Sequence, residues 1–220
     1  MNYKGYVEAK LNDKQMAHFY GNRALYAEIY DLKENQYFLI KDGNDEVVDR
    51  YCFQKGELRQ VGYNKLGGVY TGAIKPRNPH QYIAFDMMKD KTSKIKLLTG
   101  RFGSGKTLIM ANAALELIER GKFEKIVWVR NNVTVKDAPE IGYLPGTELD
   151  KMKPYLGPLC DHVGGEEGVN KLIEEGKLEV IPLGFLRGRS LRNSIVFCTE
   201  CENLTKEHLQ LLIGRIDEGS

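Results

Sequence analysis

The sequence has few of the features that mark secreted or membrane-spanning proteins. It has four cysteines in 220 residues, too few and too scattered for a disulfide framework, so we expect reduced thiols and a cytoplasmic protein. No apolar run approaches the roughly 18 residues of a membrane span. The start, MNYKGYVEAK, has no apolar core of the kind that a signal peptide needs. We therefore expect no membrane partner.

An excess of charge of one sign is also missing. The 32 lysines and arginines nearly balance the 30 acids, which leaves a formal net charge of +2. A balance so close to neutral does not indicate nucleic-acid binding by the whole surface, although it leaves room for a local basic patch. Hydrophobic residues make up 42% of the chain, enough for a folded core. The sequence shows no internal repeat and no low-complexity segment.

Two prolines, Pro76 and Pro79, mark a junction, because proline favours extended structure in the residue before it. The residues before the junction predict a small β-rich domain over 1–74. A short helix capped by Asn12 or Asp13 opens this domain. Turn signals separate runs rich in tyrosine and β-branched residues, which is a hairpin pattern. The predicted strands are Tyr26–Tyr30, Tyr37–Lys41, Glu46–Phe53 and Leu58–Val61.

After the junction, residues 75–220 alternate between strand and helix patterns and form the second predicted domain. Short apolar runs bounded by charge and glycine are typical of buried parallel strands. These runs are Lys94–Thr99, Lys125–Val129, Leu178–Leu183 and Ser194–Cys198. Between the first two, Thr107–Arg120 carries apolar residues at helical spacing. The pattern predicts an α/β fold, with a parallel sheet covered by helices on both faces.

A phosphate-binding loop follows the first of these runs. GRFGSGKT fits the pattern G-x-x-x-x-G-K-[ST] in full, after a predicted strand and at the start of a predicted helix. Its backbone N–H groups and the helix N-terminus suit phosphate oxygens. Lysine at this position reaches the β and γ phosphates, and the hydroxyl after it ligates Mg²⁺. The predicted ATP-binding residues are Gly100, Arg101, Phe102, Gly103, Ser104, Gly105, Lys106 and Thr107.

A second acidic position is expected at the end of a neighbouring strand, where it can meet the metal and the attacking water. The run Ile195–Cys198 ends in Thr199 and Glu200. Glu200 is the candidate that orients or activates water, and Lys106 and Glu200 are the two predicted catalytic residues. The alternative is that Glu200 is an acid that caps the next helix.

Several motifs in order resemble the PhoH-like ATPases, also called phosphate-starvation-inducible proteins. The resemblance covers roughly residues 74–220. It implies a RecA-like P-loop NTPase domain that uses ATP and Mg²⁺ and is coupled to RNA, as in superfamily 1 helicases. The most specific match is IGYLPGTELDKMKPYLGPLCD. The other motifs are IKPRNPHQ, GRFGSGKT, VRNNV, FLRGRSL and TECENLTKEHLQLLIGRI.

Two departures from the family pattern affect the predicted activity. The family usually has Asp-Glu at the end of the acidic strand, where this chain has Thr199 before Glu200. An uncharged hydroxyl is a poorer partner for Mg²⁺, so Thr199 is a weak metal candidate beside Thr107. The family also continues past the position of Ser220 with another strand, which implies an incomplete sheet and a fragment of a longer protein. The head resembles the segment that follows a PIN nuclease domain in longer members.

The resemblance also suggests residues that contact ligands outside the loop. Gln81 stands where related helicases use a glutamine to read the adenine edge, although it also suits the opening of a helix at Gln81–Met88. Arg187 and Arg189, with Arg192 nearby, could contact phosphates of single-stranded RNA. They could instead reach the nucleotide of a neighbouring subunit in a ring-shaped homo-oligomer, or form an ordinary solvated loop.

Three further alternatives remain open from the sequence. Cys198-x-x-Cys201 resembles half of a metal site, but a buried core thiol is the more frequent use of a cysteine in an apolar strand. The whole chain could be a nucleotide-gated binding or regulatory module with little hydrolysis, which Thr199 favours. It could also be a small-molecule or nucleoside kinase, because P-loops serve those enzymes too.

Overall fold

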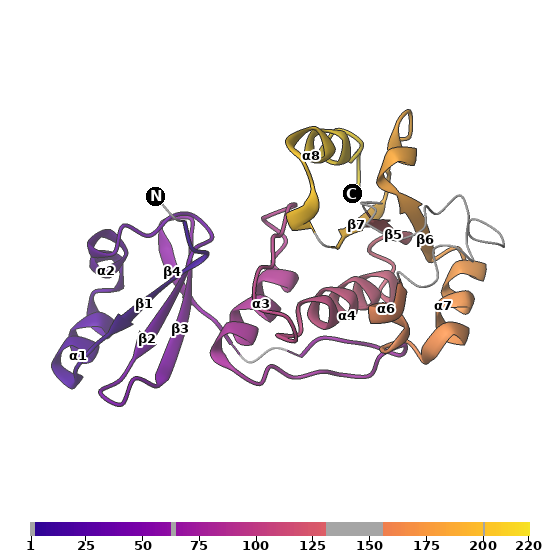
Figure 1. Ribbon diagram of the computed structural model, residues 1–220. Coiled ribbons are helices and arrows are strands. Elements are labelled where there is room, and N and C mark those ends of the chain that lie inside the picture. The colour runs from indigo at the N-terminus through magenta and orange to yellow at the C-terminus, as the bar shows by residue number, and fades with distance from the viewer. Residues whose placement is uncertain (1–2, 63–64, 131–155, 200) are drawn as a thin grey trace. The chain divides into compact units, whose positions relative to one another are not determined.

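The computed structural model describes residues 3–62, 65–130, 156–199 and 201–220 (Figure 1). The chain forms two compact units that interleave along the sequence. The first unit comprises Met1–Lys65 and Lys75–Asp90, and the second comprises Leu66–Ile74 and Lys91–Ser220. The domain boundary between residues 74 and 75 stays a prediction.

The first unit is built on a four-stranded sheet in the order β1-β2-β3-β4. The β1–β2 pair is parallel and the other two pairs are antiparallel. The strands are β1 (Tyr6–Lys10), β2 (Tyr37–Lys41), β3 (Val47–Gln54) and β4 (Glu57–Gln60). The last three confirm the predicted hairpins, and the β-rich character of this region is confirmed with them.

Helices α1 (Asp13–Gly21) and α2 (Arg23–Ile29) come between β1 and β2. The predicted cap is confirmed, since the Asn12 side chain accepts from the Gln15 N–H at 2.9 Å. The strand predicted at Tyr26–Tyr30 is wrong, because these residues lie largely in α2. Its sequence, RALYAEI, is rich in alanine, leucine and glutamate, whose helix propensity outweighs that of the tyrosine and isoleucine.

Helix α3 (Pro79–Lys89) packs on this sheet through Ile83, which joins a core cluster with Leu39 and Val61. Its Asp86 is buried and accepts two hydrogen bonds from the Arg59 guanidinium, at 3.0 and 2.6 Å. The Tyr37 hydroxyl donates a third, at 3.0 Å. A buried carboxylate is costly unless it is paired in this way, so this network holds α3 in one place on the sheet.

The second unit contains a three-stranded parallel sheet in the order β6-β5-β7. The strands are β5 (Lys125–Arg130), β6 (Leu178–Pro182) and β7 (Ser194–Cys198). The helices are α4 (Lys106–Glu119), α6 (Gly157–Cys160), α7 (Gly165–Glu174) and α8 (Lys206–Ile213), with 3-10 turns η3 (Leu183–Leu186) and η4 (Cys201–Asn203). None of the helices in the described part of the chain is long and apolar enough to cross a membrane.

Alternate residues of these strands pack on opposite faces of the sheet. On one face, Ile126, Trp128 and Phe197 join residues of α4, α6 and α7 in the largest core cluster. The Trp128 and Phe197 rings stack there with their centroids 4.3 Å apart. On the other face, Val127 and Val129 pack with residues of η3 and α8. The predicted α/β fold, with helices on both faces of a parallel sheet, is confirmed.

The strand predicted at residues 94–99 is wrong. These residues pair with no strand in the described part of the chain, and the side chains of Ile95 and Leu97 are 66% and 70% exposed. In this sheet β5 has β6 on one side and β7 on the other, and the run pairs with neither of the two outer strands. The apolar run therefore reaches the phosphate-binding loop without pairing in this sheet.

A nine-residue strap, Leu66–Ile74, is a part of the second unit that the sequence pattern did not reveal. Its backbone N–H groups donate to two carboxylates on α4: Gly67 to Glu116 at 3.0 Å, and Val69 and Tyr70 to Glu119 at 2.9 Å each. A Cβ on Gly68 would come within 1.6 Å of a Glu119 oxygen. The strap thus follows α4 closely and holds its C-terminal half.

Candidate nucleotide-binding site

The predicted phosphate loop, Gly100–Thr107, leads directly into α4. Gly105 is the N-cap of this helix and has a left-handed backbone, with φ of 86°. Gly103 is also left-handed, with φ of 74°. Residues with a Cβ rarely adopt these angles, so the two glycines allow the sharp turn that ends at a helix N-terminus. Unpaired N–H groups and the helix dipole favour an anion at such an end.

The Lys106 side chain folds back over the loop that it follows. Its ammonium donates to the carbonyl oxygens of Gly100 at 2.7 Å and of Arg101 at 3.0 Å. It also lies 5.8 Å from the centroid of the Phe102 ring, which is 97% exposed. The positive charge is therefore held at the mouth of the loop by neutral acceptors, and phosphate oxygens would make stronger, charge-assisted bonds in their place.

The end of β7 supplies the second part of the predicted site. Thr199 follows this strand, and its hydroxyl oxygen is buried with no hydrogen-bond partner among the described residues. A buried polar group without a partner is costly and often marks a position for a water or an ion. Glu200, the predicted catalytic acid, lies outside the described residues.

The donor set of this region fits Mg²⁺ held mainly through nucleotide phosphates and water. No group of three or more acidic, histidine or cysteine side chains that could hold a metal occurs in the described part of the chain. The candidates are the hydroxyls of Thr107, in the first turn of α4, and of Thr199, which is buried without a partner. Mg²⁺ commonly keeps several waters and takes few protein ligands beside substrate phosphates, so the orphaned Thr199 hydroxyl suits a metal-bound water.

Gln81 lies in the first turn of α3 and thus in the first unit, whereas the phosphate loop lies in the second. Its N–H donates to the Asn78 side chain at 2.9 Å, and its side-chain oxygen accepts from the Arg77 N–H at 2.8 Å. These bonds belong to the cap of α3, which was the alternative to adenine recognition. The adenine role stays a prediction from the resemblance.

The three arginines after η3 differ in their surroundings. Arg189 donates to Glu179 at 2.5 Å, and Arg192 donates to Asp217 at 3.0 Å. Arg187 is exposed, and the described residues offer it no hydrogen-bond or ion-pair partner. Only Arg187 therefore presents a guanidinium whose charge is not already offset by a bonded acid.

Comparison with known proteins identifies the family. A family model described as PhoH-like protein matches residues 73–220. The chain belongs to the PhoH family. PhoH proteins are P-loop NTPase-like, in agreement with the parallel sheet and the phosphate loop described above.

Curated PhoH relatives match the chain over different lengths. Protein PhoH2 of Bacillus subtilis is 28% identical over 234 aligned residues, covering 99% of this chain and 51% of the relative. Protein PhoH2 of Thermobispora bispora is 36% identical over 151 residues, or 67% of this chain and 34% of the relative. A PhoH-like protein of B. subtilis is 31% identical over 150 residues, or 67% of this chain and 45% of the relative. The chain thus spans about half or less of the PhoH relatives it matches.

The two cysteines near the acidic strand of this PhoH domain are both partly buried thiols. Cys198 is the last residue of β7 and Cys201 the first of η4. A hydrogen bond to Cys201, together with partial burial, raises the pKa of the Cys198 thiol above its usual range. Cys198 thus belongs to the strand as predicted, but it has a second thiol beside it.

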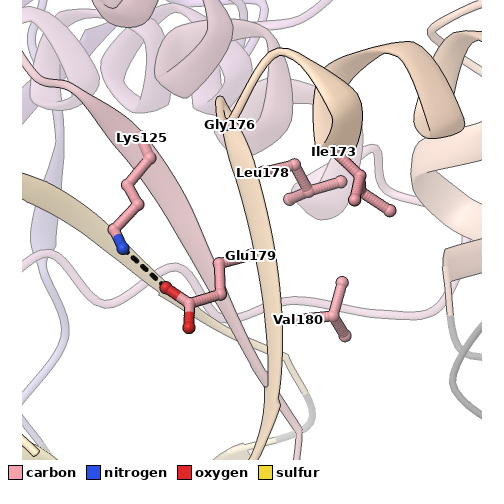
Figure 2. A pocket seen from close by; sticks show the side chains of 6 residues that line it. All are labelled: Lys125, Ile173, Gly176, Leu178, Glu179 and Val180. Atoms are coloured by element: carbon pink, nitrogen blue, oxygen red, sulfur yellow. Dashed lines mark hydrogen bonds and ion pairs between the residues drawn. The ribbon is translucent and has the colours of Figure 1, made fainter. Parts of the chain in front are cut away.

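A pocket of about 440 Å³ lies over β6 and is lined by Lys125, Ile173, Gly176, Leu178, Glu179 and Val180. Figure 2 shows Lys125 and Glu179 facing each other across a 2.6 Å ion pair, with the apolar side chains on the other side of β6. Burial alone would raise the pKa of Glu179, but the hydrogen bonds from Lys125 and Arg189 outweigh it and lower the pKa.

This pocket lies at the amino ends of β5 and β6, whereas Thr199 follows the carboxyl end of β7. Ligands of open parallel sheets bind at the carboxyl ends of the strands. We therefore treat the phosphate loop, and not this pocket, as the site. The residues that sequence reasoning missed, Glu116 and Glu119, gave no local signal, because their partners lie in the strap some 50 residues earlier.

Nucleotide affinity should depend on Lys106. We expect Lys106→Ala to weaken ATP binding tenfold or more, which is about 1.4 kcal/mol, because it removes a charge-assisted contact with phosphate. Isothermal titration calorimetry measures the ATP affinity of both proteins. Lys122→Ala, which removes an exposed lysine of the same unit, serves as the matched control and should bind normally. Equal affinities of Lys106→Ala and the unaltered chain would mean that the loop is not a phosphate site.

Proposed function

We propose that this chain binds ATP with Mg²⁺ and hydrolyses it. The single observation that carries the proposal is the left-handed turn at Gly103 and Gly105, which ends at the N-terminus of α4 with the Lys106 ammonium at its mouth. Phosphoryl transfer needs little more of a protein than positioning and charge stabilisation. A loop of this form can supply both.

In the proposed mechanism the chain's own groups have separate tasks. Backbone N–H groups of the loop and the Lys106 ammonium bind the β and γ phosphates, and the Thr107 hydroxyl contributes to holding Mg²⁺. When bound, Mg²⁺ neutralises part of the charge on the phosphate oxygens. Glu200 orients the attacking water and accepts its proton. An arginine from elsewhere, or from a neighbouring subunit, offsets developing charge.

One observation favours a second candidate, a nucleotide-gated binding module with little turnover. At the end of β7 the chain has the neutral, buried hydroxyl of Thr199 where an acid would hold the metal-bound water more firmly. Binding would then depend on the phosphate loop as before, but the hydrolytic step would be slow. The two candidates therefore differ in turnover and not in affinity.

We further propose that the loop after η3 contacts RNA phosphates or the nucleotide of an adjacent subunit. Arg187 supports this, because it is exposed and its charge is not offset by a bonded acid among the described residues. Arg189 is the weaker candidate for a phosphate contact, because it already pairs with Glu179, which also pairs with Lys125. With a net charge of only +2, RNA affinity has to come from such a local group.

Hydrolysis should depend on Glu200. Glu200→Gln keeps the shape of the side chain but removes the carboxylate, so phosphate release should fall at least tenfold while ATP affinity persists. Thr199→Asp restores an acid and should raise the affinity for Mg²⁺. A phosphate-release assay and a Mg²⁺ titration at saturating ATP measure the two effects. Unchanged phosphate release in Glu200→Gln would mean that another residue orients the water. If the unaltered chain releases no phosphate, the nucleotide-gated binding module is favoured instead.

RNA binding should depend on salt through the arginine loop. Each phosphate contact on a single strand contributes about −0.7 to the slope of log affinity against log salt. We expect Arg187→Ala to make the slope shallower by about one contact, Arg189→Ala by less, and Lys122→Ala by none. Fluorescence anisotropy with a single-stranded RNA measures this. If neither substitution changes the slope, the loop is an ordinary solvated turn. If a substitution instead lowers ATPase activity only in assembled protein, the arginine contacts a neighbouring subunit.

A further inference from the structure

The last residue of β7 and the first residue of η4 are both cysteines, and they stand on either side of Thr199 and Glu200. The Cys201 thiol donates to the Cys198 carbonyl oxygen at 3.2 Å, and it lies close enough to the Cys198 thiol to raise the pKa of that group. Thr199 and Glu200 are the two residues between them. The sulfur atoms are thus neighbours before any bond joins them.

The other two cysteines are placed differently. Cys52 lies in β3 and is buried in the core of the first unit, and Cys160 ends the short helix α6. A disulfide needs two Cα atoms within about 4.4–6.8 Å of each other and side chains that face one another. Cys198 and Cys201 are three residues apart in the sequence, and the Cys201 sulfur lies 3.2 Å from the Cys198 carbonyl oxygen, so the two thiols are the closest match to these requirements among the cysteines.

We propose that Cys198 and Cys201 form a reversible disulfide when a hydroperoxide oxidises them, and that this bond slows nucleotide hydrolysis. The second half rests on the proposed roles of Thr199 and Glu200. The first half depends only on the placement of the two thiols. Paired cysteines in reducing compartments are used for transient, redox-sensing disulfides more often than for permanent ones.

The oxidation is balanced with the hydroperoxide as the two-electron oxidant. One cysteine sulfur attacks the peroxide; an S–O bond forms, the O–O bond breaks, and hydrogen peroxide leaves one water. The second sulfur then displaces the hydroxyl of the sulfenic acid, which forms the S–S bond and releases a second water. The two thiols lose two electrons and two protons in total, which the peroxide takes up to form the two waters. A dithiol reductant reverses the reaction by thiol–disulfide exchange.

The consequence for the site follows from the position of the bond. Covalent S–S bonding at about 2.05 Å draws the two sulfurs closer than any non-bonded contact and removes the thiol that donates to the Cys198 carbonyl. The backbone that carries Thr199 has to adjust. A displacement of about 1 Å at a catalytic group can cost on the order of a hundredfold in rate, whereas the phosphate loop, at the start of α4, keeps its own contacts.

The test is to treat the full chain with hydrogen peroxide and then count thiols, weigh the protein and assay it. We expect two of the four thiols to disappear. The mass of the protein should fall by the mass of two hydrogens. Phosphate release should fall about tenfold or more, and dithiothreitol should restore it. ATP affinity should change less than about threefold, because the loop and Lys106 bind the phosphates.

Matched variants locate the effect. Cys198→Ser and Cys201→Ser should each prevent the disulfide and the peroxide response, while Cys160→Ser should keep both. A thiol loss that persists in Cys201→Ser, or a disulfide without a change in phosphate release, would overturn the proposal and leave the proposed hydrolysis intact. A reduced chain that releases no phosphate would instead contradict the proposed hydrolysis and the switch together.

Discussion

The backbone turn at Gly103 and Gly105 is the constraint on which the rest of the candidate site depends. A left-handed conformation at these two positions is what lets the chain end its extended run and begin α4 within a few residues. The same turn places Lys106 over the loop carbonyls and Thr107 in the first helical turn. Without it, the helix N-terminus and the ammonium would not serve the same anion.

The turn is useful only because α4 is held firmly. Ala111 and Leu115 of α4 are buried in the core cluster that contains Trp128 of β5. The strap also holds the C-terminal half of the helix through Glu116 and Glu119. Side chains of the sheet and backbone groups of a distant loop thus fix the same helix, so the phosphate loop starts from a rigid support.

The sequence predicted those features that local patterns determine. The P-loop motif, the runs that became β5, β6 and β7, and the cap at Asn12 depend on residues within one turn or one strand. One failure, the strand predicted at Tyr26–Tyr30, has a local cause in the helix propensity of RALYAEI. The other failures depend on partners far along the chain. The run at 94–99 lacked a free edge beside β5, and nothing near Gly67 indicates its bond to Glu116.

The candidate site also combines features that local sequence predicts with features that depend on distant partners. Its loop residues were predicted from the motif and lie together in space, whereas the surroundings of the outlying candidates could not be read from local sequence. The pairing of Arg189 with Glu179 and the neighbouring thiols of Cys198 and Cys201 follow only from the folded chain. Long-range contacts of this kind decide which charges stay available to a ligand and which are already paired.

The most direct test of the account is amide hydrogen exchange over residues 100–107, followed by mass spectrometry with ATP·Mg²⁺, ADP·Mg²⁺ or adenosine at saturating concentration. If the loop's N–H groups bind phosphate, ATP and ADP should slow exchange in this peptide, because bonded amides exchange only on opening. Adenosine, which has no phosphate, should leave it unchanged. The central claim that Gly100–Thr107 is a phosphate site would be contradicted if this peptide exchanged equally with all three ligands. It would also be contradicted if adenosine slowed the exchange as strongly as ATP.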